Sequence, residues 1–179
     1  NSNMKKGSKD NYTNGLKNSA QFPKPSLMKS IHKTNNDLEQ LSAQDQLQWG
    51  LEQFDERFVL TTSFGIQSAV LLHMTVGLKS NKKLKVIWID TGYLPKETYN
   101  YAEKLKKLFG LDLVVSQSSI SPARMEALYG RLWETGAQKD LEKYHQIRKV
   151  EPLEKTLSNL NVHCWASGVR KKKTKNRES

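Results

Sequence analysis

Short apolar runs alternate along the middle of the chain with polar turns and with longer segments of helical periodicity. Four of the runs read as buried strands: Phe58–Leu60, Lys85–Ile89, Leu111–Val115 and Asn161–Ala166. Apolar residues recur at helical spacing in the segments that follow Gln67, Leu94 and Pro122. This alternation predicts an α/β fold, with an open parallel sheet flanked by helices.

Capping residues predict several helix boundaries. Asp37, with Gln40 three residues later, is typical of a helix N-terminus. Gly110 and Gly136 are expected to end helices, and Pro122 after Ser121 is expected to begin one.

The composition narrows the class of protein. The 179 residues suffice for one domain with a real core. No apolar run approaches the roughly 20 residues that span a bilayer, and the N-terminus lacks the apolar segment of a signal peptide. The single cysteine excludes an intrachain disulfide framework and fits a reducing compartment. We therefore expect a cytoplasmic protein that does not bind a membrane.

The net charge of +11 lies at the two ends of the chain. Residues 1–33 carry seven Lys and one Asp, and residues 168–179 carry six basic residues and one Glu, which leaves 16 basic and 16 acidic residues between them. A nucleic-acid groove would need a basic face in the folded part, so that interpretation is disfavoured. We expect residues 1–33 to form a flexible basic tail and residues 34–179 to form the domain.

A polar loop follows the first predicted strand. Ser63 and Ser68 supply hydroxyl donors, and Gly65 lets the backbone approach a ligand closely. Because the first amides of a helix lack partners, a phosphate or sulfate can bind there. An ordinary serine-capped turn explains the same residues equally well.

The later strands also end in polar residues. Asp90 could accept a ribose or amide hydrogen bond, and Gly92 could lie against a flat base, although a simple turn into the next helix fits as well. Taken alone, Arg148 and Lys149 are expected to form a solvated face. Arg170 could bind a phosphate or sulfate through two parallel N–H groups.

Together these segments resemble the assimilatory phosphoadenylyl-sulfate reductase family, the thioredoxin-dependent enzymes of sulfate assimilation and cysteine biosynthesis. The resemblance runs from about Asn35 to Ser179. It rests on five motifs in order: Ser63–Val70, Asp90–Leu94 with Glu97–Tyr99, Tyr129–Glu134, Lys149–Pro152 and Trp165–Arg170.

The resemblance implies a Rossmann-like, adenine-nucleotide α-hydrolase-like fold and a sulfonucleotide site. Its substrate-binding residues would be Ser63, Phe64, Gly65, Gln67, Ser68, Asp90, Thr91, Gly92, Lys149, Gly168, Arg170, Lys171 and Arg177. Among them, Lys149 and Arg170 would face the phosphosulfate. ATP-cleaving relatives carry Asp at the position of Gln67, which disfavours ATP cleavage here.

The resemblance also implies the redox partner. A sister branch that reduces adenylyl sulfate binds an iron–sulfur cluster through cysteines, and the first pair would fall at Tyr144 and His145, which are not thiolate ligands. The chain therefore resembles the cluster-free branch, with thioredoxin or glutaredoxin as the electron donor and no bound metal or flavin. The family is usually dimeric, so a homodimer is an expectation for this chain.

The family's nucleophile is a cysteine in a C-terminal Glu-Cys-Gly-Leu-His-like motif, which these 179 residues lack. Cys164 lies on a predicted buried strand and is expected to be structural. Several interpretations stay open: a reductase whose C-terminal part lies outside this sequence, an inactive sulfonucleotide-binding module, an adenylyl-sulfate reductase-like enzyme, and, least favoured, a protein that associates with nucleic acid.

Overall fold

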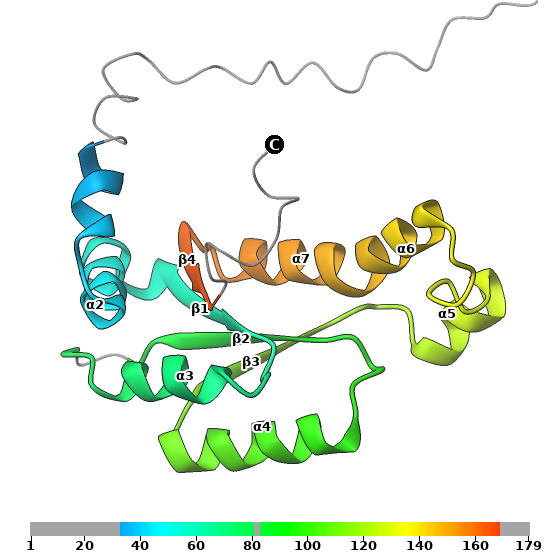
Figure 1. Ribbon diagram of the computed structural model, residues 1–179, viewed down its shortest axis with the longest axis horizontal. Helices are drawn as coiled ribbons and strands as arrows, with labels where there is room; N and C mark the ends of the chain where they lie inside the picture. The colour runs from blue at the N-terminus through cyan, green and yellow to red at the C-terminus, as the bar shows by residue number, and fades with distance from the viewer. Residues whose placement is uncertain (1–32, 81–82, 169–179) are drawn as a thin grey trace, which may run out of the picture. The chain divides into compact units, whose positions relative to one another are not determined.

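A computed structural model describes residues 33–80 and 83–168 (Figure 1). The chain divides into two units, Asn1–Gln40 and Leu41–Ser179. In the first unit, residues 33–39 are helical, so the predicted cap at Asp37 is wrong: that residue lies inside a helix. In the second unit, helix α2 (Ala43–Phe54) begins after Ser42, whose hydroxyl accepts the Asp45 N–H at 3.1 Å.

Four parallel strands form the sheet in the order β3–β2–β1–β4. They are β1 (Phe58–Thr62), β2 (Lys85–Asp90), β3 (Asp112–Gln117) and β4 (Cys164–Ser167). The predicted α/β class with a parallel sheet is thus confirmed. Between β1 and β4 the strand order reverses, and in such sheets ligands bind in the crevice at the carboxyl ends beside the reversal.

Helices flank both faces of the sheet (Figure 1). Together with α2, the helices α3 (Ser68–Val76) and α4 (Lys96–Phe109) enclose the main core, in which Leu60, Val86 and Trp88 contact Leu72 and Leu105. On the opposite face, α7 (Glu151–Asn159) packs on β3, where the Thr156 hydroxyl donates to the Ser116 hydroxyl at 2.8 Å. In the described part of the chain, no helix combines the length and the apolar character needed to cross a bilayer.

The structure confirms some predicted helix ends and corrects one. Gly110 ends α4 in the left-handed region, at φ 58°, where glycine has no steric penalty. Helix α5 (Pro122–Tyr129) starts after Ser121, as predicted. It ends at Gly130 instead of Gly136, because the chain leaves the helical region there at φ 70° and ψ −170°.

A single long helix with a widened turn follows. Helix α6 (Gln138–His145) runs directly into a π turn (Gln146–Val150) and then into α7. The Glu151 N–H donates to the carbonyl of Gln146, five residues earlier. Pro152, which follows at once, has no N–H to donate, so the ordinary four-residue ladder is interrupted here.

Candidate functional site

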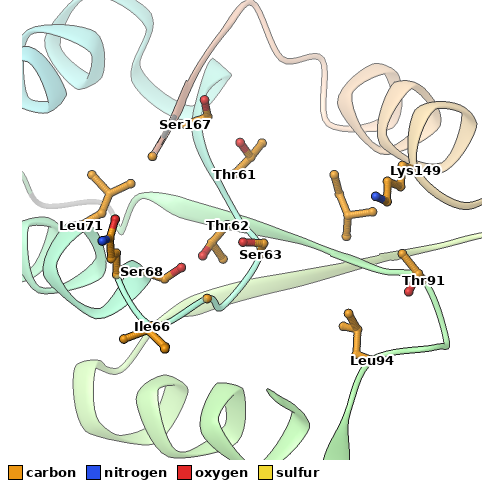
Figure 2. Close-up of a pocket in the computed structure, with 14 residues that line it drawn as sticks. Thr61, Thr62, Ser63, Ile66, Ser68, Leu71, Thr91, Leu94, Lys149 and Ser167 are labelled. Carbon is orange, nitrogen blue, oxygen red and sulfur yellow. The ribbon is translucent and has the colours of Figure 1, made fainter. Parts of the chain in front are cut away.

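A cavity of about 690 Å³ lies at the carboxyl ends of β1, β2 and β4 (Figure 2). This is the edge at which the strand order reverses. Its lining residues are Thr61, Thr62, Ser63, Gly65, Ile66, Gln67, Ser68, Leu71, Ile89, Thr91, Leu94, Lys149, Ser167 and Gly168. Three segments at strand ends and one helical turn, far apart in the sequence, therefore meet at one site.

The loop between β1 and α3 forms one wall of the cavity. The Thr62 hydroxyl accepts the Phe64 N–H at 3.2 Å, and the Gly65 carbonyl accepts the Ser68 N–H at 2.8 Å. Gln67, at the N-cap position of α3, makes no side-chain hydrogen bond to the helix. The helix N-terminus thus lies at the cavity wall, where its amides and its dipole favour an anion.

Phe64 was expected to contact the ligand, but the structure places its side chain away from the cavity. It is 2% exposed, and its ring packs edge-on against Trp88 with 5.1 Å between the ring centroids. Its φ of 50° is unusual for a residue other than glycine. Phe64 therefore anchors the loop to the core, while Ile66, at 94% exposed, lies at the cavity rim.

Asp90 was also expected to contact the ligand, and its carboxylate is instead occupied within the protein. Its Oδ1 accepts from the Gly92 N–H and the Tyr99 hydroxyl, both at 2.8 Å, and its Oδ2 accepts from the Gln117 side chain at 2.6 Å. The residue is 6% exposed and does not line the cavity. Asp90 therefore joins the β2–α4 turn to α4 and β3.

Gly92 does not line the cavity either. It has a φ of 76°, and a Cβ atom there would lie 2.7 Å from Cγ of Pro122. The glycine is required by the left-handed backbone and by the close approach of Pro122. From this turn, Thr91 and Leu94 line the cavity.

The prediction of a solvated face at Arg148 is wrong, because Arg148 is only 2% exposed. Its neighbour Lys149 lines the cavity, and Figure 2 shows the lysine side chain extending from the helix toward the loop of Ser63. Among the described lining residues, Lys149 carries the only formal charge. The described cavity is therefore cationic and rich in hydroxyl groups, which suits an anionic ligand.

The end of β4 supplies the fourth segment. Ser167 and Gly168 line the cavity, and a Cβ atom on Gly168 would lie 3.2 Å from Leu71 Cδ2. Nearby, the Thr61 hydroxyl donates to the Ala166 carbonyl at 3.2 Å. The predicted ligands Arg170, Lys171 and Arg177 lie outside the described residues.

Several lining residues were absent from the predicted set. They are Thr61, Thr62, Ile66, Leu71, Ile89, Leu94 and Ser167. Thr62 and Ser167 are the last residues of their strands, so the rule that ligands bind at strand ends could have indicated them. The apolar members carry no comparable signal, because apolar side chains in this part of the sequence equally suit the core.

Cys164 lies away from the cavity. It begins β4, three residues before Ser167, which is about 10 Å along a strand. Its side chain packs against the main core, and burial raises the pKa of its thiol. These features disfavour the thiolate that a nucleophile needs.

Residues 57–179 match the family model described as phosphoadenosine phosphosulfate reductase domain. A phosphoadenosine 5′-phosphosulfate reductase from a Synechococcus strain is 48% identical over 155 residues, covering 87% of this chain and 66% of that protein. The same enzyme from Zymomonas mobilis is 40% identical over 156 residues, covering 87% of this chain and 63% of that protein. The chain thus spans less than two thirds of the length of these relatives.

A solved structure of an enzyme with the same activity name is also similar to this chain. The crystal structure of a phosphoadenylyl-sulfate reductase from Candida auris, a phosphate complex, superposes with a TM-score of 0.67. It is 29% identical, and the match covers 80% of this chain and 68% of that one. The parallel sheet flanked by helices is common to both.

Proposed function

The chain belongs to the phosphoadenosine phosphosulfate reductase family, and from this premise we propose that its cavity binds 3′-phosphoadenylyl sulfate for reduction to sulfite. The observation that carries the proposal is the convergence of four family-like motifs on one cavity. The described contributions are Ser63 to Ser68, Thr91, Lys149 and Gly168. Arg170, Lys171 and Arg177 belong to the proposed site by resemblance.

The chemistry of the cavity supports a sulfonucleotide ligand. Its volume of about 690 Å³ is in the range typical of small-molecule sites. Lys149, the serine hydroxyls and the N-terminus of α3 favour phosphate or sulfate groups. Ile66, Ile89 and Leu94 offer apolar contacts for a flat base. The phosphate bound by the Candida auris relative is consistent with an anion site.

The reaction that we propose needs a thiolate that Cys164 is poorly placed to supply. A cysteine thiolate attacks the sulfur of the substrate, the bond between sulfur and the phosphate oxygen breaks, and adenosine 3′,5′-bisphosphate leaves with the bonding electrons. The enzyme then carries a thiosulfonate. A dithiol, reduced thioredoxin or glutaredoxin, attacks this thiosulfonate, releases sulfite and ends as a disulfide. In this scheme the residues described here bind and orient the substrate.

A second candidate is a nucleotide-binding module that carries out no reduction. The position of Cys164 favours it, since the one thiol in the sequence lies at the amino end of β4 and the cavity lies at the carboxyl end. An adenylyl-sulfate reductase-like activity differs in the ligand, which lacks the 3′-phosphate. Tyr144 and His145 lie where the resemblance puts the first cysteine pair of that branch, so we propose no iron–sulfur cluster. By analogy with the family, we also propose no bound flavin.

The remaining expectations stay proposals. They are a cytoplasmic location, a homodimer and a domain over residues 34–179; the basic tail predicted for residues 1–33 lies outside the described residues, apart from residue 33. The charge distribution still disfavours a nucleic-acid partner.

Calorimetry and a sulfite assay test the proposal on the 179-residue chain. We expect adenosine 3′,5′-bisphosphate to bind at least about tenfold more tightly than adenosine 5′-monophosphate, because a second phosphate adds charge-assisted contacts. We expect no sulfite from 3′-phosphoadenylyl sulfate and reduced thioredoxin. Equal affinities for the two nucleotides would contradict the substrate assignment, and sulfite formation abolished by Cys164→Ser would contradict the structural role of Cys164.

A further inference from the structure

Arg148 is a buried cation without an anionic partner among the described residues. It is 2% exposed, and its Nη1 donates to the Ile120 carbonyl at 2.6 Å. Its Nε and Nη2 are buried and find no acceptor in the described part of the chain. Because burying an incompletely paired charge destabilises a fold, a contribution to stability does not explain an arginine here.

The guanidinium group joins three segments around the cavity. It lies over the ring of Tyr93, with 5.3 Å between Cζ and the ring centroid. Tyr93 belongs to the β2–α4 turn, between the cavity-lining residues Thr91 and Leu94. Ile120 belongs to the loop before α5, and Arg148 itself lies on the π turn. One side chain therefore fixes the π turn against two loops.

Lys149, the residue after Arg148, is the one charged side chain among the described residues that line the cavity. In a regular α-helix consecutive side chains point about 100° apart, so a fixed direction for Arg148 also fixes the direction of Lys149. The backbone around them lacks the usual support, because the π turn replaces the four-residue ladder ahead of Pro152. The contacts of Arg148 with Ile120 and Tyr93 supply side-chain support where this ladder is interrupted.

We propose that Arg148 is a positioning residue: its contacts with Ile120 and Tyr93 hold the π turn so that the Lys149 ammonium group faces the cavity. The inference rests on the proposed function, which supplies the nucleotide that Lys149 meets. It predicts opposite effects on stability and on binding. A side chain kept for packing alone would affect stability first.

A double-mutant cycle tests the proposal, with adenosine 3′,5′-bisphosphate as the probe. Arg148→Met is expected to weaken the affinity about tenfold, the size of one lost charge-assisted contact. Its urea midpoint is expected to equal or exceed that of the wild type, because an apolar side chain of similar volume replaces a buried charge. Lys149→Ala is expected to weaken the affinity about tenfold. Added to Lys149→Ala, Arg148→Met is expected to change the affinity less than about twofold.

Arg124→Met is the matched control, because Arg124 is an exposed arginine on α5 outside the lining of the cavity. It is expected to leave both the affinity and the urea midpoint unchanged. If Arg148→Met does not fold, Arg148→Lys takes its place in the cycle. Lysine keeps a donor for the Ile120 carbonyl and loses the planar group over Tyr93, so a smaller loss of affinity is expected.

Three outcomes would overturn the inference. They are an unchanged affinity in both Arg148 variants, a loss of affinity that persists in full in the Lys149→Ala background, and a lowered urea midpoint with unchanged binding. A wild-type chain that does not bind the nucleotide would overturn the proposed function itself. The wild-type titration therefore separates the two failures.

Discussion

The two loops that follow β1 and β2 look alike in sequence and differ in the structure. Each comes after a buried strand, contains a glycine and leads into a helix. The β1–α3 loop presents Ser63, Gly65 and Gln67 to the cavity and has one buried anchor, Phe64. At the β2–α4 turn, the Asp90 carboxylate is hydrogen-bonded within the protein and Gly92 packs against Pro122. From this turn, Thr91 and Leu94 line the cavity.

This difference shows that a polar residue at a strand end is not by itself a ligand contact. Trp88 and Asp90 alternate with Ile89 along β2, so Asp90 shares the face that carries the main core. There it meets Tyr99 and Gln117 rather than the cavity. For Asp90, the hydrogen-bond partners on this face of the sheet make the carboxylate an internal support.

The largest expected effect on stability comes from removing Phe64, which anchors the β1–α3 loop to the core. Phe64→Ala removes a buried ring from its contact with Trp88 and is expected to lower the free energy of unfolding by about 3 to 5 kcal/mol. Urea unfolding followed by circular dichroism measures this loss. Ile66→Ala, on the exposed rim of the same loop, is the control and is expected to cost less than about 0.5 kcal/mol. Equal costs would contradict the assignment of Phe64 as the anchor.

The next largest effect on stability comes from removing the Asp90 carboxylate, which supports the β2–α4 turn. Asp90→Ala leaves the Gly92 N–H, the Tyr99 hydroxyl and the Gln117 amide without their acceptor, at an expected cost of about 3 kcal/mol. Gln67→Ala removes a polar side chain of the first loop that makes no hydrogen bond to its helix, so it is expected to leave the free energy of unfolding within about 0.5 kcal/mol of the wild type. An Asp90 variant as stable as the wild type would remove the distinction between the loops.

The two glycines give a matched pair. Gly92→Ala forces a Cβ atom against Pro122 at a positive φ and is expected to cost about 2 kcal/mol of unfolding free energy. At Gly65 the nearest atom to an added Cβ is Ser63 Oγ, at 3.7 Å, so Gly65→Ala is expected to fold normally. Calorimetry should instead find weaker binding of adenosine 3′,5′-bisphosphate. The reverse pattern would contradict the roles assigned to the two loops.

The smallest effect is a pH dependence. Burial and the hydrogen bond to Asp90 raise the pKa of Tyr99. The unfolded chain therefore loses this phenolic proton first, and the stability that the neutral phenol contributes falls as the pH rises above about 10. Tyr99→Phe is expected to make the alkaline decrease of the unfolding free energy shallower, with Tyr101→Phe on the same helix as the control. Parallel curves for Tyr99→Phe and the wild type would contradict this coupling.

Sequence patterns predicted the strands and the parallel sheet well, because alternation of buried strands with amphipathic helices leaves few topologies. They also predicted the β1–α3 loop as one wall of the cavity. The helix end at Gly136 was wrong, since Leu132 is buried against Met125 without being helical. An apolar residue at helical spacing satisfies the pattern in either conformation.

The sequence did not predict the burial of Arg148, because arginine is ordinarily exposed at the protein surface. The contact that buries it involves Ile120, 28 residues earlier in the chain, and no local pattern encodes it. The roles of Asp90 and Gly92 also depended on distant partners, Gln117 and Pro122. Those partners became apparent only once the strands were aligned.

The helix from Gln138 to Asn159 can also be regarded as an α-helix with one surplus residue, accommodated at Gln146–Val150. Removing one residue there would restore regular helical spacing and would rotate the segments on either side by about 100° relative to each other. Lys149 and Pro152 could then no longer both keep their present directions. Relatives that gain or lose a single residue in this helix should therefore differ in the shape of this cavity even where every cavity-lining side chain is identical.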